Sequence, residues 1–171
     1  MEETLYRYNP WWEKSFRLEG LIDRVKLFKV LQHSLSQKEV VFLTGLRRVG
    51  KTTLLKLLIN HLLLTVNIAP RYIFFVSLDD YTLASKSILE LVEEFRKIQR
   101  LRFEEKIYLF FDEVTYQKDF EIQLKNLYDQ QNVKIYASSS SASLLKRGKP
   151  SLTGRSTIIE VLPLDFEEYL V

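Results

Sequence analysis

An eight-residue segment, GLRRVGKT at residues 45–52, matches the pattern G-x-x-x-x-G-K-[ST] at every fixed position. We call this segment the glycine loop. In such a pattern backbone N–H groups surround a polyphosphate, and glycine permits both the unusual dihedral angles and the close approach that this requires. The loop functions between a buried strand and a helix whose amino end faces the anion. The segment therefore predicts a strand, a tight turn and a helix, in this order.

The last two residues of the glycine loop have the side chains predicted to contact the phosphates and the metal ion. Lys51 is predicted to bring a positive charge to the β and γ phosphates, and Thr52 to offer its hydroxyl to Mg²⁺. An ordinary strand-turn-helix with a surface lysine is the alternative. Arg47 and Arg48 occupy variable positions of the pattern and are expected to face solvent or a partner. The predicted cofactor-binding residues are Gly45, Leu46, Arg47, Arg48, Val49, Gly50, Lys51, Thr52 and Thr53.

Strand-like and helix-like segments alternate along the chain. Short apolar runs rich in β-branched and aromatic residues predict strands over residues 40–44, 72–78, 107–111, 133–137 and 157–162. Helical spacing predicts helices over residues 21–36, 51–64, 88–101 and 119–128, a short helix over 142–146, and another that begins at about residue 164. This alternation predicts an α/β fold, in which helices cover both faces of a parallel five-stranded sheet.

A second candidate site lies where the apolar run at residues 107–111 ends in Asp112 and Glu113. Ligands collect at the carboxyl ends of parallel strands. Asp112 is predicted to hold the hydration shell of Mg²⁺, and Glu113 to orient, or accept a proton from, the water that attacks a γ phosphate. Two acids at a strand end are also common as solvated turn residues. The glycine loop about sixty residues earlier favours the catalytic interpretation.

Two further residues are candidates for catalysis. The fourth predicted strand runs into four serines at residues 138–141, of which Ser139 is the one we expect to contact the γ phosphate or the water. Serine is equally a common loop and helix-capping residue. Arg155 precedes the last predicted strand, where it could reach the γ phosphate of its own site or of a neighbouring subunit. The alternative is a surface arginine in the basic loop over residues 146–156.

The composition limits the classes of function. The chain has no cysteine, which excludes disulfides, zinc-thiolate sites and a thiol nucleophile. Its net charge of +3 is too small to argue for nucleic acid by itself. The amino end lacks the apolar run of a signal peptide, and no apolar stretch approaches the length of a membrane span. We expect a cytoplasmic protein without a membrane segment.

The first 38 residues are expected to form a segment and a first helix that pack on the core of residues 39–171. Trp11 and Trp12 lie in this segment as an adjacent pair. Because exposing two indole rings is costly, they either pack against the core or meet the adenine of a nucleotide. We favour packing.

A resemblance to a known family covers most of the chain and rests on six segments. They are TGLRRVGKTTLL, YIFFVSLDD, IYLFFDEV, DFEIQLKNLYD, KIYASSSSASLLKRG and SLTGRSTIIEVLPLDFEEYL. In these segments the sequence resembles the archaeal and bacterial AAA-type P-loop ATPases that carry a C-terminal domain of unknown function. The last segment is the most specific to that family. The resemblance implies a three-layer αβα P-loop NTPase fold with the ASCE-type strand order 5-1-4-3-2.

The resemblance also implies cofactors, site residues and partners. Lys51, Thr52, Asp112 and Glu113 match the two Walker motifs, so ATP and Mg²⁺ are the implied cofactors. The serine strand matches a sensor position, although relatives commonly have T-G-S-S where this chain has A-S-S-S. Family members continue into winged-helix-like and nuclease-like domains. We therefore expect an effector domain beyond residue 171, with nucleic acid and further copies of the chain as candidate partners.

Three functions are compatible with these residues. The first is an ATPase that powers or switches attached domains, in a process that could involve DNA. The second is a kinase of a nucleotide or other small molecule, with the basic loop over residues 146–155 as a lid. The third is a nucleotide-dependent switch that does not hydrolyse. An acid directly after the magnesium aspartate favours water over an acceptor hydroxyl, and motifs for guanine recognition are missing from the sequence.

Overall fold

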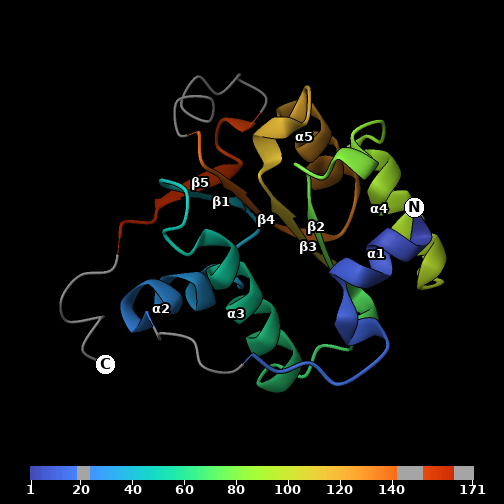
Figure 1. Ribbon diagram of the computed structural model, residues 1–171, viewed down its shortest axis with the longest axis horizontal. Helices are drawn as coiled ribbons and strands as arrows, with labels where there is room; N and C mark the ends of the chain where they lie inside the picture. The colour runs from blue at the N-terminus through green and yellow to red at the C-terminus, as the bar shows by residue number, and fades with distance from the viewer. Residues whose placement is uncertain (19–23, 142–151, 164–171) are drawn as a thin grey trace.

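The computed structural model of the chain describes residues 1–18, 24–141 and 152–163. Within them a five-stranded sheet carries helices on both of its faces (Figure 1). The strands are β1 (Val40–Thr44), β2 (Ile73–Ser77), β3 (Ile107–Asp112), β4 (Val133–Ser139) and β5 (Ser156–Glu160). They are all parallel and lie in the order β2-β3-β4-β1-β5. The predicted α/β fold and the strand order implied by the family resemblance are thus confirmed.

The register of the sheet aligns the carboxyl ends of its strands. Thr44 at the end of β1 pairs with Ser139 at the end of β4, and Ser77 at the end of β2 pairs with Asp112 at the end of β3. Because the strands are parallel, the segments that follow them leave the sheet at the same end. The glycine loop, which follows β1, and the acids that end β3 therefore lie at one end of the sheet.

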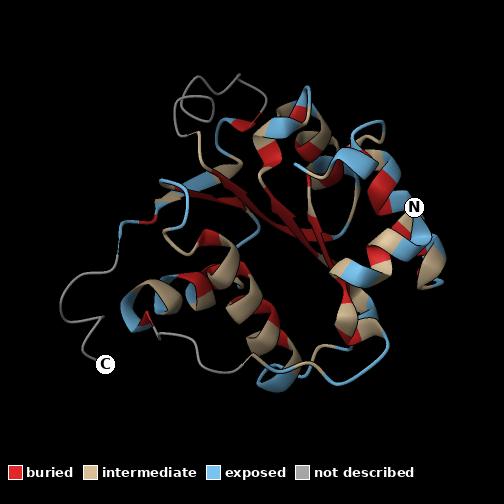
Figure 2. Ribbon diagram, viewed as in Figure 1, coloured by how far each residue is buried: buried red, intermediate tan, exposed pale blue. Residues whose placement is uncertain are grey.

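Two apolar cores flank the sheet. One core includes residues of α1 (Glu2–Tyr8), α4 (Ile88–Ile98) and α5 (Phe120–Gln130), and the other includes residues of α2 (Val25–Ser34) and α3 (Lys51–Leu64). The central strands are buried along almost their whole length (Figure 2), as expected for strands covered on both faces. β5 is partly exposed and lies at one edge of the sheet. Among the described residues, each helix is too short or too polar for a bilayer crossing.

The bounds of most elements follow the sequence predictions. β1 and α3 have the predicted bounds. β4 continues through Ser138 and Ser139, two residues further than predicted. α2 begins at Val25 rather than at residue 21, and residues 19–23 lie outside the described part of the chain. The predicted helices over residues 142–146 and from residue 164 also lie outside the described residues.

The N-terminal segment covers the edge of β2. The Asn9 side chain pairs with this strand as a neighbouring backbone would: its Nδ2 donates to the Phe75 carbonyl at 2.9 Å, and its Oδ1 accepts from the Phe75 amide at 2.7 Å. The indole N–H groups of Trp11 and Trp12 both donate to the Ile73 carbonyl, at 3.1 and 2.9 Å. These bonds pair backbone groups at the edge of β2 with side chains of the same chain, and so protect the edge from pairing with another strand.

Both tryptophans also pack in the interior. Trp11 is buried in the core that includes α2 and α3. Trp12 stacks in the other core on Phe74 and Phe95, with ring centroids 6.2 and 5.6 Å away. Of the two alternatives drawn from the sequence, the structure places both indole rings in packing positions.

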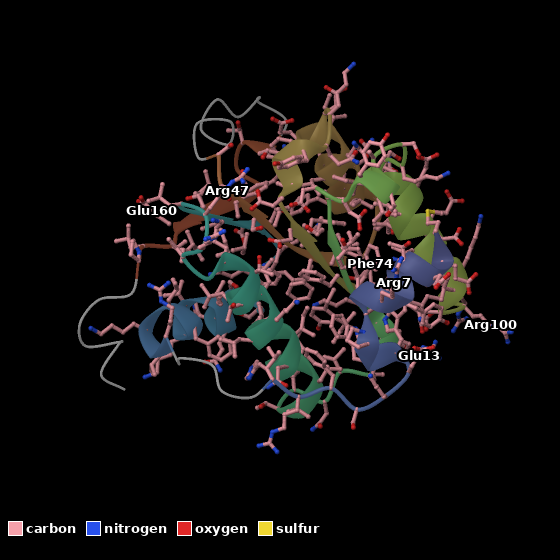
Figure 3. The ribbon with its side chains drawn as sticks, in the orientation of Figure 1. Arg7, Glu13, Arg47, Phe74, Arg100 and Glu160 are labelled. Carbon is pink, nitrogen blue, oxygen red and sulfur yellow. The ribbon has the colours of Figure 1, made fainter. Side chains whose placement is uncertain are left out.

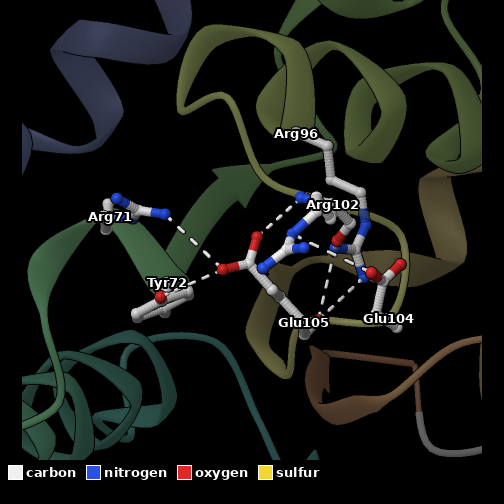
Figure 4. Close-up of polar contacts among 6 residues, drawn as sticks. All are labelled: Arg71, Tyr72, Arg96, Arg102, Glu104 and Glu105. Carbon is white, nitrogen blue, oxygen red and sulfur yellow. Dashed lines mark hydrogen bonds and ion pairs between the residues drawn. The ribbon is translucent and has the colours of Figure 1, made fainter.

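A buried arginine organises the turn between α4 and β3 (Figure 4). Arg96 Nη1 donates to the carbonyls of Arg102 at 2.6 Å and of Glu105 at 3.3 Å, and Arg96 Nε donates to Gln131 Oε1 at 3.1 Å. The Glu105 carboxylate accepts from the Arg102 amide at 2.6 Å and lies 3.6 Å from the Arg71 guanidinium. Hydrogen bonds of this kind offset the cost of burying a guanidinium. The network fixes the amino end of β3, remote from the glycine loop.

Lys134 on β4 is 2% exposed and is expected to make the stability of the fold depend on pH. Its Nζ donates to the carbonyls of Gln37 and Glu39, both at 2.7 Å, and burial lowers the pKa of Lys134 to about 8. Because this folded-state pKa lies below the unfolded value, the buried charge costs stability below about pH 8, and the cost falls as the pH rises. We expect the free energy of unfolding to rise by roughly 2 kcal/mol between about pH 7.5 and about pH 9.5.

Chemical denaturation across this pH range checks the prediction. The control is Lys134→Met, which removes the titrating group and should flatten the rise. The same rise in both proteins would assign the pH dependence to another group.

Candidate functional site

A cavity of about 260 Å³ opens at the carboxyl ends of the strands. The glycine loop and the first turn of α3 form one side of it, and the residues that follow β3 and β4 form the other. Arg47 projects from the loop after β1 (Figure 3). Six of the nine predicted cofactor-binding residues line this one cavity. The lining residues are Arg47, Arg48, Gly50, Lys51, Thr52, Thr53, Glu113 and Ser140.

Two glycines give the loop its path for different reasons. Gly50, at the N-cap of α3, has a φ of +99°, a left-handed conformation that favours glycine. Gly45 is needed for space, because a Cβ atom there would lie 2.3 Å from the Val161 carbonyl oxygen. The Val161 amide in turn donates to the Thr44 carbonyl at 2.6 Å. The chain after β5 therefore passes directly over the start of the glycine loop and fixes its first residue.

Lys51 is buried in the loop, with 5% of its surface exposed. Its Nζ donates to the carbonyls of Gly45 at 2.8 Å and of Leu46 at 2.6 Å. Burial lowers the pKa of Lys51, and the nearby carboxylates of Glu113 and Asp112 oppose this shift. Loop carbonyls thus hold the ammonium group at the wall of the cavity, where it can bind an anion that enters.

Thr52 and Asp112 form a pair of oxygen ligands. Thr52 Oγ1 donates to Asp112 Oδ2 at 2.7 Å. The Ser138 hydroxyl donates to the other carboxylate oxygen of Asp112 and accepts from the Glu113 amide at 3.1 Å. Mg²⁺ prefers such oxygen ligands and usually completes its shell with water and phosphate oxygens. The described residues hold no cluster of three acidic, histidine or cysteine side chains for a metal ion. The pair therefore fits an ion that arrives with a phosphate ligand.

Glu113 follows β3 in an uncommon backbone conformation. Its φ and ψ are both 51°, in the left-handed region, where residues other than glycine are rare and often functional. Its Oε1 accepts from the Ser140 hydroxyl at 2.8 Å, and its Oε2 accepts a weaker bond from the Ser140 amide at 3.4 Å. Glu113 lines the same cavity as Lys51. A carboxylate in this position can orient or deprotonate a water molecule.

The structure brings Ser140, and not Ser139, to Glu113. Ser139 is fully buried; its hydroxyl lies 3.0 Å from the Thr115 hydroxyl and accepts a backbone N–H at 2.9 Å. Side chains alternate along a strand, so Ser138 and Ser140 share the side that faces the acids. The structure therefore places the predicted Ser139 on the side of β4 away from Glu113, and it brings to the acids Ser138 and Ser140, which the sequence prediction did not select.

Arg155 lies at the opposite end of the sheet. Its carbonyl accepts from the Val40 amide at 2.8 Å, at the start of β1, whereas the glycine loop follows the end of β1. Its Nε lies 3.3 Å from Asp129 Oδ1 on α5. The structure does not bring Arg155 to the cavity of its own chain. The parallel sheet is the reason, since a residue just before a strand lies at the amino end of that sheet.

A wider hollow of about 540 Å³ adjoins the cavity at Glu113 and Ser140. Two exposed apolar side chains flank it, Leu46 at 71% and Tyr116 at 58% exposure. Arg47 Nη2 lies 3.4 Å from the Tyr116 hydroxyl, at the limit of a hydrogen bond. Exposed apolar groups beside a polar site are typical of a surface that contacts another molecule. We refer to Leu46, Arg47 and Tyr116 as the rim of the site.

Comparison with known proteins identifies the family. The family model described as an AAA domain matches residues 37–170. The chain belongs to this AAA family. A curated protein of Methanocaldococcus jannaschii, MJ1637, is 35% identical to this AAA domain over 167 residues, which are 97% of the chain. The chain spans 34% of the length of that relative.

Solved structures share the fold of this AAA domain. The Walker-type ATPase PABY2304 of Pyrococcus abyssi superposes with a TM-score of 0.58 at 20% identity, over 89% of this chain and 57% of that one. PCH-2 of C. elegans superposes with a TM-score of 0.56 at 18% identity, over 93% of this chain and 47% of that one. The chain is therefore an AAA-type P-loop ATPase domain by family and by fold.

Proposed function

We propose that this AAA domain binds ATP with Mg²⁺ and hydrolyses the γ phosphate. The observation that carries the proposal is that Lys51, Thr52 and Glu113 line one cavity, with Asp112 bonded to Thr52. Lys51 and the backbone amides of the glycine loop would hold the β and γ phosphates. Thr52 and Asp112 would hold Mg²⁺, which when bound neutralises charge on the phosphate oxygens.

Glu113 is the proposed general base. Its carboxylate, held by Ser140, would orient the attacking water and accept its proton, because it lies on the wall of the cavity across from the glycine loop. A carboxylate in this position supports hydrolysis over transfer to an acceptor hydroxyl. It also supports hydrolysis over a switch that only binds nucleotide, since binding alone requires no such base.

Phosphate release from ATP, measured without an added acceptor, tests the proposal. We expect release that depends on Mg²⁺ and stops when the ion is chelated. Release that requires an added acceptor hydroxyl would favour the kinase. Nucleotide binding with no release under either condition would favour the switch.

Replacing the two serines at the end of β4 should separate their roles. Ser140→Ala removes a hydroxyl bonded to the Glu113 carboxylate and should slow phosphate release roughly tenfold, the worth of one hydrogen bond to a charged group. Ser139→Ala should instead leave the rate near that of the wild type and lower the free energy of unfolding by about 1 kcal/mol. Single-turnover rates and thermal unfolding measure the two effects. A larger rate loss in folded Ser139→Ala than in Ser140→Ala would reverse the assignment.

A role for Arg155 in turnover is proposed only between chains. Its guanidinium lies on the surface, with 38% of the side chain exposed, and its partner Asp129 is also half-exposed. A neighbouring copy of the chain could present Arg155 to the rim of this site, where a cation would stabilise charge on the transferred phosphate. ATP-dependent self-association, together with loss of turnover in Arg155→Ala, would support this homo-oligomer.

The biological output of the ATPase is proposed from the family alone. The family resemblance implies that members join the domain to further domains, and this chain spans 34% of the length of the relative MJ1637. We infer that ATP turnover powers or switches such attached domains, with nucleic acid as a candidate target. Salt-sensitive binding of DNA to the full-length polypeptide would support a nucleic-acid target.

A further inference from the structure

A second cavity, of about 260 Å³, lies beside the ATP site and is formed mainly by the N-terminal segment. We call it the N-terminal cavity. Its lining includes four aromatic side chains, Tyr8, Trp11, Phe16 and Phe75. Thr52 and Asp112, the proposed ligands of Mg²⁺, also line it. It opens at the carboxyl ends of β2 and β3, the end of a parallel sheet at which ligands bind.

Specific bonds hold the wall of the N-terminal cavity in place. The Tyr8 hydroxyl donates to Asp80 Oδ2 at 2.6 Å and ties α1 to the loop after β2. Asn9 pairs with both backbone groups of Phe75, and the Trp11 indole donates to a carbonyl of the same strand. Trp11 and Phe16 make an edge-to-face contact with ring centroids 5.1 Å apart. These bonds and contacts therefore fix the positions of the residues that line the cavity.

Two cationic side chains line the N-terminal cavity. Arg7 is exposed in the last turn of α1, and Lys56 lies one turn after Thr52 on α3, with its Nζ 5.5 Å from the centre of the Phe75 ring. Neither forms an ion pair with a carboxylate within the described residues. Three nearby acids each accept from a hydroxyl group, Asp80 from Tyr8, Asp112 from Thr52 and Asp79 from Ser77, and none of them, in the part of the chain that the structure describes, forms an ion pair with Arg7 or Lys56. The cations are thus placed to attract a negatively charged ligand.

We propose that the N-terminal cavity binds one nucleotide unit, with its base on the aromatic floor and its phosphate between Arg7 and Lys56. An aromatic floor with flanking cations is the arrangement that binds single nucleotide units by stacking and charge. The cavity is just below the roughly 300 to 1,000 Å³ of sites for drug-sized ligands, which suits a single unit. The unit could belong to a free nucleotide or to a single-stranded nucleic acid.

Occupancy of the N-terminal cavity would also affect the ATP site. Thr52 lines both cavities, and its partner Asp112 lines the N-terminal cavity, so a ligand there contacts residues that serve the ATP site. This coupling rests on the proposed ATPase function. Binding to the N-terminal cavity does not, because it depends only on the aromatic floor and the two cations.

Tryptophan fluorescence provides a direct test. Trp11 and Trp12 are the only tryptophans of the sequence, and Trp11 lines the cavity, so an entering base should quench the emission. We would titrate the protein with thymidine monophosphate and, separately, with a short oligothymidylate. The double variant Arg7→Gln with Lys56→Gln should lower the affinity measured by quenching by roughly tenfold or more, since each substitution removes a charged contact to phosphate. The matched control is Lys97→Gln with Arg100→Gln, two exposed cations elsewhere; Figure 3 shows Arg100 apart from Arg7.

The titrations distinguish a free nucleotide from a nucleic acid strand as the ligand, and they include results that would overturn the proposal. Quenching by the mononucleotide identifies a free nucleotide as sufficient, whereas quenching by the oligonucleotide alone identifies a nucleic acid strand. Lys51→Ala should leave the quenching unchanged, which separates it from binding in the glycine loop. Absence of quenching by both ligands, or equal quenching in the two double variants, overturns the proposal. Neither result would bear on ATP turnover, which is measured separately.

Discussion

Glu113→Gln is expected to bind Mg²⁺ and ATP like the wild type and to release phosphate roughly a hundredfold to ten-thousandfold more slowly, the usual contribution of a general base. The amide oxygen of glutamine can still accept from the Ser140 hydroxyl, so the local geometry should persist. It cannot accept a proton from water. Nucleotide affinity by calorimetry and phosphate release under single turnover measure the two properties on one sample.

The control for this variant is Glu104→Gln, which removes the same charge from a residue 72% exposed at the other end of β3 (Figure 4). It should match the wild type in both measurements. If Glu113→Gln keeps more than about a tenth of the wild-type rate, Glu113 is not the base, because general-base catalysis is typically worth more than that factor.

Lys51→Ala is expected to weaken nucleotide binding itself, the step before hydrolysis. The Lys51 ammonium is the cation at the wall of the cavity that the glycine loop builds, and charge-assisted hydrogen bonds to phosphate are each worth about 1.5 to 3 kcal/mol. The affinity for ATP with Mg²⁺ should therefore fall by roughly tenfold to more than a hundredfold. Equilibrium titration of a fluorescent ATP analogue measures this loss.

The interpretation of Lys51→Ala requires two controls. Lys51 also bonds the carbonyls of Gly45 and Leu46, so the variant needs an unfolding curve to show that the loop still folds. Lys97→Ala removes an exposed lysine from α4 and should leave the affinity unchanged. Unchanged affinity in folded Lys51→Ala would mean that the nucleotide binds elsewhere.

The elements nearest the site could be predicted from the sequence because local pattern and chemistry agree there. β1 is a continuous apolar run that ends at Gly45, and α3 begins at Lys51, the position that the loop pattern requires. Asp112 ends β3 as the apolar run before it indicates. The strand order needed the family resemblance, because periodicity does not encode which strands are neighbours.

The positions of some residues depend on relations between elements that a linear pattern does not carry. The sequence does not show that β4 continues to Ser139, and alternation along β4 directs this side chain away from Glu113. Arg155 precedes a parallel strand and so belongs to the amino end of the sheet, a consequence that follows only once β5 is paired with β1. Asn9 has no apolar pattern at all, and its role depends on the edge of β2.

Calorimetric titration of ATP into the purified protein, with and without Mg²⁺, tests the central claim most directly. We predict saturable binding of ATP that tightens with Mg²⁺ and is lost in Lys51→Ala, because one cavity holds Lys51 and Thr52, and Thr52 is hydrogen-bonded to Asp112. Absence of binding in the wild type, or binding that neither Mg²⁺ nor the lysine affects, would contradict the assignment of this cavity to a magnesium nucleotide.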